Sequence, residues 1–152
     1  MPDEIHALAE TRLRRIDLRY TAGRRAIVAA LMRSGGPVSI TDIADELPSL
    51  PRSSAYRHLV DLQSAGVVRR IAANDEFARF ELAEELTEHH HHFLCTECGK
   101  VIDVTPSSAF EKTVTRHLEE LAGAAGFQPH GHRIDVVGLC SSCRGAGRPA
   151  RI

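Results

Sequence analysis

A run of four histidines, residues 89–92, leads directly into the first of two Cys-x-x-Cys pairs in the segment EHHHHFLCTEC. Imidazole nitrogens and thiolate sulfurs are the side-chain atoms that bind zinc and related metals most readily. We expect the two pairs to close one tetrahedral zinc site, formed by Cys95, Cys98, Cys140 and Cys143. Because four cysteine ligands leave no position open for a substrate, this site would be structural, with redox chemistry as the weaker alternative.

The histidine run has a second property if residues 88–95 form a strand. Side chains alternate between the two faces of a strand, so His89 and His91 would point one way and His90 and His92 the other. One short stretch of backbone would then serve two metal sites. The alternatives are an expression tag, against which the internal position argues, and a loose histidine-rich metal buffer, which normally lies in low-complexity sequence.

The composition is that of a globular protein with one domain or two small ones, since 43% of the 152 residues are hydrophobic and 26% are charged. No apolar run approaches the ~20 residues that span a bilayer, and the segment MPDEIHALAETRLRR lacks the apolar core of a signal peptide. We therefore expect a cytoplasmic protein without a membrane partner. In that reducing compartment the cysteines favour metal binding over disulfides.

The charges divide unevenly along the chain. Residues 1–72 carry 11 Lys and Arg against 8 Asp and Glu, and the other 80 residues carry 8 against 12. A basic N-terminal half suits an anionic partner, and an acidic half rich in histidine and cysteine suits cations.

The N-terminal half is typical of four helices followed by a hairpin. Apolar residues recur at helical spacing in 4–16, 22–34, 40–47 and 53–65. Thr21, Ser39 or Thr41, and Ser53 or Ser54 are candidate N-caps, and Gly35 and Gly66 are candidate stops. The runs VVRRI and FARFEL, separated by a turn at Asn74-Asp75, predict a hairpin. The last three helices and this hairpin predict a winged helix-turn-helix.

In such a fold the helix at about 53–65 would enter the major groove of double-stranded DNA, and the hairpin would contact the phosphate backbone. The candidate DNA contacts are Arg52, Ser54, Tyr56, Arg57, Arg69 and Arg70. The competing interpretation is that exposed arginines only solvate a helix. Helix order, turn positions and the charge surplus together favour nucleic-acid binding.

Taken in order, RYTAGRRAIVAAL, SSAYRHL, RFEL, EHHHHFLCTECGKVID, GHRIDVVGLC and SSC resemble the ferric uptake regulator family of metal-sensing repressors, over residues 15–143. The resemblance implies an α+β protein that forms a homodimer. Residues 1–84 would form the winged-helix DNA-binding domain. Residues 85–152 would form a small α/β dimerisation domain, with a disordered tail from about 145.

The resemblance also implies three metal sites. The four cysteines match a structural zinc site. The regulatory site at the hinge between the domains would use Glu81, His90, His92 and Asp103. An additional site would use His89, His91, Glu111 and His132, with Thr115 at an alternative alignment of Glu111. Strand alternation gives the same pairing of the histidines.

The chain departs from the family pattern in two ways. Pro37 lies where iron- and peroxide-sensing members often have a histidine. Arg69 and a residue near Glu85 replace an aspartate and a cysteine that zinc-sensing members often use. Two histidines and two carboxylates suit Fe²⁺ or Mn²⁺ at least as well as Zn²⁺, so the regulatory metal stays open among the three.

We therefore expect a metal-responsive repressor of metal uptake and homeostasis genes, in which metal at the hinge organises the dimer for a palindromic operator. The alternatives are a metal storage or chaperone protein and a metal-independent winged-helix regulator with structural zinc. An enzyme is not expected, because the sequence has no H-E-x-x-H or nucleophile motif.

Overall fold

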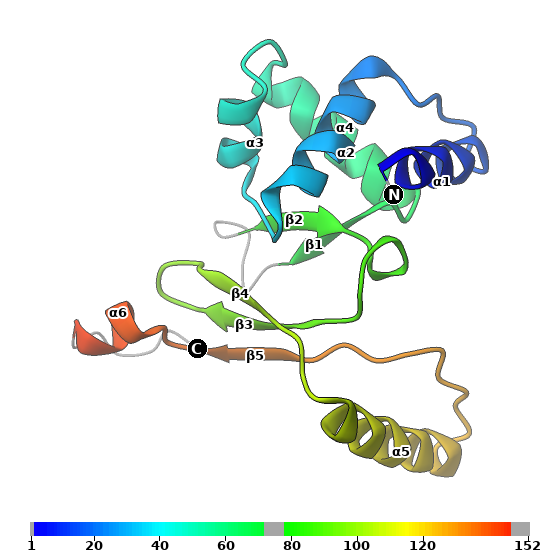
Figure 1. The fold of residues 1–152 in the computed structure, drawn as a ribbon, viewed down its shortest axis with the longest axis vertical. Coiled ribbons are helices and arrows are strands. Elements are labelled where there is room, and N and C mark those ends of the chain that lie inside the picture. The colour runs from blue at the N-terminus through cyan, green and yellow to red at the C-terminus, as the bar shows by residue number, and fades with distance from the viewer. Residues whose placement is uncertain (1, 72–77, 147–152) are drawn as a thin grey trace.

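Four helices and a hairpin form the N-terminal region of the computed structural model, which describes residues 2–71 and 78–146 (Figure 1). The elements are α1 (Pro2–Arg14), α2 (Ala22–Ser34), α3 (Ile40–Glu46), α4 (Arg52–Ser64), β1 (Val68–Ile71) and β2 (Arg79–Leu82). The two strands pair antiparallel, with Arg69 opposite Glu81. This arrangement confirms the predicted winged helix-turn-helix. The turn expected at Asn74-Asp75 lies outside the described residues.

The apolar faces of these helices meet in one core above the hairpin (Figure 1). Leu13 of α1, Ile27 of α2, Ile43 of α3 and Leu59 of α4 are fully buried there. In α1, α2 and α4 these residues recur at helical spacing with other buried residues of the same helix, which is why the sequence periodicity locates the core. Phe80 closes the core from the hairpin side.

The helix ends follow the predicted signals, with one exception. Ser39 and Asp42 form a capping box on α3, in which the Asp42 amide donates to Ser39 Oγ at 3.1 Å and the Ser39 amide donates to Asp42 Oδ2 at 2.7 Å. Gly35 and Gly66 have φ values of 65° and 70°, as expected for helix stops. Neither Ser53 nor Ser54 caps α4. This helix begins earlier, at Arg52, because Pro51 supplies the extended backbone before it.

The C-terminal region is a three-stranded sheet with one long helix. Its elements are the 3₁₀ turn η1 (Glu84–Leu86), β3 (His91–Cys95), β4 (Val101–Val104), α5 (Ser108–Ala124), β5 (Asp135–Gly138) and α6 (Ser141–Gly145). Strand β3 lies in the centre, antiparallel to β4 and parallel to β5. The boundary predicted at residue 84 falls in η1.

Helix α5 connects β4 to β5 and projects beyond the sheet (Figure 1). It begins at Ser108 because Ser107 caps it by accepting from the Phe110 amide at 3.3 Å. None of its residues is buried within the chain. The predicted disordered tail from about 145 lies mostly outside the described residues, and residues 141–145 form α6. Among the described residues, no helix has the length and apolar character to cross a membrane.

Candidate metal centres

Strand β3 begins at His91 rather than at residue 88, so alternation along it places His91 and His92 in two separate clusters, and His89 and His90 join these clusters from the residues just before the strand. In each cluster one ligand atom from every residue lies within 4.8 Å of the others. The hinge cluster is Glu81, His90, His92 and Asp103. The second cluster is His89, His91, Glu111 and His132.

The hinge cluster joins the two regions of the fold, because Glu81 comes from the winged-helix hairpin and the other three residues from around β3 and β4. Glu81 Oε2 lies 3.2 Å from both His90 Nε2 and His92 Nε2. Asp103 Oδ1 lies 3.7 Å from His92 Nε2. Two imidazole nitrogens and two carboxylates therefore meet at one point, supplied by β2, by β4 and by the start of β3 with the residue before it.

The outer nitrogens of both hinge histidines are engaged by acceptors. His92 Nδ1 lies 3.1 Å from Asp135 Oδ1, and His90 Nδ1 lies 2.7 Å from the Glu88 carbonyl oxygen. A proton on each Nδ1 would leave both Nε2 atoms as acceptors facing the cluster, which is the arrangement of a metal-binding histidine. The donor set thus fits a divalent metal.

Electrostatics keep Glu81 ionised inside this site. Burial would raise its pKa, but hydrogen bonds with His92 and Arg69 and the charge of Arg69 outweigh burial and lower the pKa to about 2. Burial of His92 would lower its pKa, yet its hydrogen bond with Glu81 and the Glu81 charge raise it. The pKa of Asp103 is raised, chiefly by burial.

A cavity of about 580 Å³ opens beside the hinge cluster, lined by Glu81, His90 and Asp103 and by the loop after α2. In that loop, a Cβ built on Gly36 would lie 3.3 Å from Asp103 Oδ2. The backbone next to Pro37 therefore forms one wall of the hinge site.

The second cluster lies on the opposite face of β3 and is completed by the first turn of α5. Glu111 Oε1 lies 2.8 Å from His91 Nε2, and Glu111 Oε2 lies 3.2 Å from both His89 Nε2 and His132 Nε2. The Nε2 atoms of His89 and His132 are buried, and both face Glu111. Buried imidazole nitrogens aimed at one carboxylate fit a metal site, and they favour Glu111 over Thr115.

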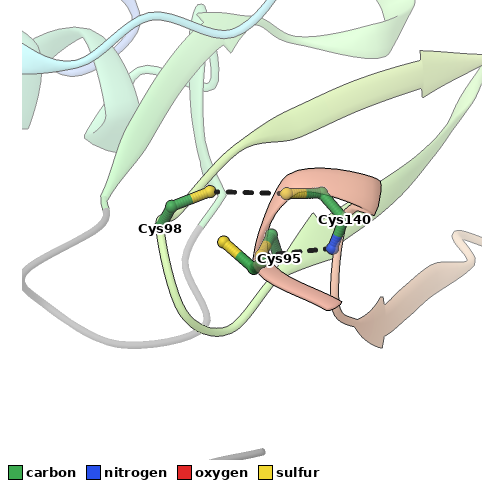
Figure 2. Close-up of side chains that lie close together, drawn as sticks. Cys95, Cys98 and Cys140 are labelled. Atoms are coloured by element: carbon green, nitrogen blue, oxygen red, sulfur yellow. Dashed lines mark hydrogen bonds between the residues drawn. The ribbon is translucent and has the colours of Figure 1, made fainter. Parts of the chain in front are cut away.

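The four cysteines come together where the β3–β4 turn meets the start of α6, and Figure 2 shows three of them, Cys95, Cys98 and Cys140. Cys98 Sγ lies 3.8 Å from Cys140 Sγ, and the Cys140 amide donates to Cys95 Sγ at 3.4 Å. Gly99, with φ 69°, makes the tight turn after the first pair. Burial would raise the pKa of Cys95, but donating backbone amides lower it to about 6. Backbone and side-chain hydrogen bonds with Cys143 also lower the pKa of Cys140, whereas hydrogen bonds with Cys140 and Cys98 raise the pKa of Cys143 to about 12. All four are free cysteines, and four sulfurs in one cluster fit tetrahedral zinc.

The expected DNA contacts divide between exposed and inward-facing side chains. Arg52, Tyr56 and Arg57 are exposed on α4, and Arg70 is exposed on β1. Ser54 is partly buried and accepts a hydrogen bond from Arg57 Nη2 at 3.3 Å. Arg69 departs from the expectation. Its side chain is only 11% exposed and pairs with Glu81 across the hairpin, so it is not free to reach a phosphate.

Sequence reasoning missed two residues, Asp135 and Glu84, and misplaced Arg69. Asp135 lies beside His92 because β3 and β5 pair in parallel, with these two residues in register. Glu84 accepts a hydrogen bond from His89 Nδ1. The one indication of these roles in the sequence is that each of the two acidic residues lies close along the chain to a predicted ligand or strand.

Comparison with known proteins supports the family resemblance and the fold. Residues 15–137 match the sequence model of the ferric uptake regulator family. The chain is 28% identical to the peroxide operon regulator of Bacillus subtilis over 145 residues, covering 92% of this chain and 93% of that protein.

Two solved structures share the fold. The structure of the Helicobacter pylori ferric uptake regulator Fur, described as revealing three functional metal binding sites, has a TM-score of 0.74 at 22% identity and covers 95% of this chain and 94% of its own. A zinc uptake regulator complexed with zinc and DNA has a TM-score of 0.56 at 24% identity, with 96% and 97% covered.

Proposed function

The chain belongs to the ferric uptake regulator family, and we propose that it is a transcriptional repressor whose DNA binding is controlled by divalent metal at the hinge cluster. The observation that carries this proposal is the position of Glu81. Its carboxylate belongs to the winged-helix hairpin, but it contacts His90 and His92 of the other region. Ligation there would join the DNA-binding and dimerisation domains, taken as residues 1–84 and 85–152.

The C-terminal region has the surface of a dimer interface. Apolar side chains exposed on its sheet are Phe93, Ile102, Val136 and Val137, and those on α5 are Phe110, Leu118 and Leu121. Strand β5 is an edge of the sheet, open to pairing with another strand. Exposed apolar surface of this extent favours association with a second copy of the chain.

A homodimer presents two α4 helices, and their separation decides whether both can enter successive major grooves. A divalent metal at the hinge supplies a positive centre that the ligands of both regions share. Glu81 would then hold β2, and with it the winged helix, against β3 and β4. If the metal binds this closed arrangement ~100-fold more tightly than the open one, it stabilises the closed arrangement by about 2.7 kcal/mol. That free energy is enough to shift DNA affinity by a similar factor.

The cysteine cluster and the hinge cluster suit different sets of metals. Four cysteines suit a permanent structural Zn²⁺. The hinge cluster, with nitrogen and oxygen donors and no thiolate, suits Fe²⁺, Mn²⁺ or Zn²⁺. The controlled genes would be those of metal uptake and homeostasis, with the protein acting in the cytoplasm on double-stranded DNA.

A titration tests this function. Protein loaded with zinc at the cysteines alone is titrated separately with Fe²⁺, Mn²⁺ and Zn²⁺, and its binding to a palindromic duplex, selected from a random-sequence pool with metal present, is followed by fluorescence anisotropy at fixed salt. At least one metal should raise DNA affinity by about tenfold or more. Glu81→Gln should lose that response, whereas Glu85→Gln, at an exposed position in η1, should keep it.

The alternatives give different results. A storage or chaperone protein would bind metal at the hinge without any metal-dependent preference for the duplex. A metal-independent regulator would bind the duplex equally well with and without the second metal. Either outcome would overturn the proposed function.

Peroxide is a second candidate input, because the Bacillus subtilis relative is a peroxide operon regulator. Fe²⁺ at the hinge could be oxidised by peroxide, whereas Zn²⁺ has no redox chemistry. Peroxide should therefore release DNA from the iron-loaded protein but not from the zinc-loaded protein. Equal release from both would exclude sensing through the hinge metal.

A further inference from the structure

Arg69 lies between the hinge cluster and the second cluster and contacts two carboxylates, one on the side of each cluster. On one side its Nε donates to Glu81 Oε1 at 2.8 Å, and its Nη2 donates to the same oxygen. On the other side its Nη1 lies 3.8 Å from Glu84 Oε2. With 11% of its side chain exposed, Arg69 is largely shielded from solvent, so these ion pairs are weakly screened.

Glu84 continues the connection into the second cluster. Its other oxygen, Oε1, accepts a hydrogen bond from His89 Nδ1. His89 Nε2 faces Glu111 inside the cluster. A carboxylate on the outer nitrogen of a histidine ligand is the usual arrangement that orients the ring toward a metal.

The four residues Glu81, Arg69, Glu84 and His89 thus form a continuous path, here called the arginine relay. Each end residue uses one atom for the relay and a different atom for a metal cluster. Glu81 gives Oε1 to Arg69 and Oε2 to the hinge histidines. His89 gives Nδ1 to Glu84 and Nε2 to Glu111. Neither end has to leave its cluster to take part in the relay.

We propose that Arg69 and Glu84 are positioning residues that couple the two clusters, so that occupancy of the second cluster raises the metal affinity of the hinge cluster. This inference rests on the proposed function, in that both clusters bind metal. With His89 fixed by ligation, its Nδ1–H would hold Glu84, and Glu84 would hold the Arg69 guanidinium. Arg69 would then fix Glu81 with Oε2 directed at His90 and His92, which lowers the cost of ordering the hinge site.

Two other routes of coupling give different results. Two divalent cations in neighbouring clusters repel one another, so direct electrostatics would make occupancy of the second cluster weaken the hinge. The backbone of β3, which carries ligands of both clusters, could also transmit a change. Backbone transmission would not depend on Glu84, whereas the arginine relay requires it.

A double-mutant cycle separates these routes. His132→Ala empties the second cluster, and Glu84→Gln breaks the relay without removing a proposed ligand. The four proteins, with zinc at the cysteines, are titrated with Zn²⁺ in a chelator buffer. Amide resonances of Glu81 and Glu111 report the occupancy of each cluster separately, and the same spectra show whether each variant is folded.

We expect His132→Ala to raise the free Zn²⁺ needed to half-fill the hinge by about tenfold in the otherwise unaltered chain. In the Glu84→Gln background, His132→Ala should change the free Zn²⁺ needed to half-fill the hinge by less than about twofold. Glu85→Gln, which removes a carboxylate of the same turn that pairs with Arg12 rather than with either cluster, should behave as the unaltered chain. Arg69→Lys keeps the positive charge but loses the paired donation of Nε and Nη2 to Glu81, so it should give the same result as Glu84→Gln. If Glu84→Gln does not fold, Arg69→Lys takes its place in the cycle.

If His132→Ala weakens Zn²⁺ binding at the hinge equally with and without the Glu84 carboxylate, the relay is wrong and the backbone of β3 transmits the coupling. Tighter hinge binding in His132→Ala would overturn it in favour of repulsion, and no effect would mean that the clusters are independent. If the Glu81 resonance of the unaltered chain never responds to metal, the proposed function itself fails, which is distinct from all three of these results.

Discussion

Gly36 and Asp103 face each other across the hinge between the two regions, so closely that a Cβ built on Gly36 would lie 3.3 Å from Asp103 Oδ2. Gly36 follows α2 in the winged helix, and Asp103 belongs to β4 of the C-terminal sheet. The absence of a side chain at Gly36 therefore lets the winged helix approach a proposed ligand of the hinge cluster.

Gly36→Ala should weaken metal binding at the hinge by about three- to tenfold, because the added methyl group displaces the Asp103 carboxylate or holds the regions apart. Stability should change by less than about 1 kcal/mol, since alanine also reduces the entropy of the unfolded chain. Metal affinity and thermal unfolding measure the two effects. Gly123→Ala, where nothing lies within 4 Å, is the matched control and should leave affinity unchanged. Unaltered affinity in Gly36→Ala would mean that Asp103 is not required at the hinge.

Removal of zinc from the cysteine cluster should have a different consequence from loss of the hinge metal. The cluster ties the β3–β4 turn to α6, and structural zinc of this kind contributes on the order of 10 kcal/mol to folding. Cys95→Ser should therefore unfold the C-terminal region and abolish the dimer, whereas Glu81→Gln should keep both. Circular dichroism and sedimentation distinguish the two variants. Similar losses in both would contradict the division into structural and regulatory sites.

The affinity of the hinge for metal should decrease as the pH falls. The pKa of His92 is raised above its ordinary 6.5, so His92 binds a proton at a pH where an unperturbed histidine would have lost it. Metal must displace that proton from Nε2, which costs about a tenfold loss of affinity per pH unit below the His92 pKa and nothing well above it. Glu81, with a pKa of about 2, stays ionised throughout and adds no pH dependence.

Manganese affinity measured across the neutral range, together with an NMR titration of His92 in protein without hinge metal, checks this expectation. The fall in affinity should begin at the pH where the His92 resonance titrates. A metal affinity that stays constant through that pH would show that metal does not displace a proton from His92. His92 would then not be a ligand.

The sequence was most informative where one local rule decides the structure. Alternation along β3 placed His91 and His92 in different clusters, and the period of 2 left no other outcome once a strand formed. It was least informative where two distant segments must meet. Arg69 was expected to contact DNA because it lies in the hairpin of the winged helix, and only the register opposite Glu81 shows that its side chain turns inward. Asp135 was missed for the same reason, since its contact with His92 depends on the parallel pairing of β3 and β5.

The correction to Arg69 sharpens the prediction for DNA binding. Arg57 of α4 is exposed and lies on the helix that would enter the major groove, whereas Arg69 is held by Glu81. Arg57→Ala should therefore weaken binding to the selected duplex and, if it contacts a phosphate, reduce the slope of log affinity against log salt by about 1. With saturating metal at the hinge, Arg69→Gln should leave that slope unchanged, because Arg69 pairs with Glu81 and does not neutralise a phosphate. Anisotropy at a series of salt concentrations measures both slopes, and a reduced slope in Arg69→Gln would show that Arg69 leaves Glu81 to bind DNA.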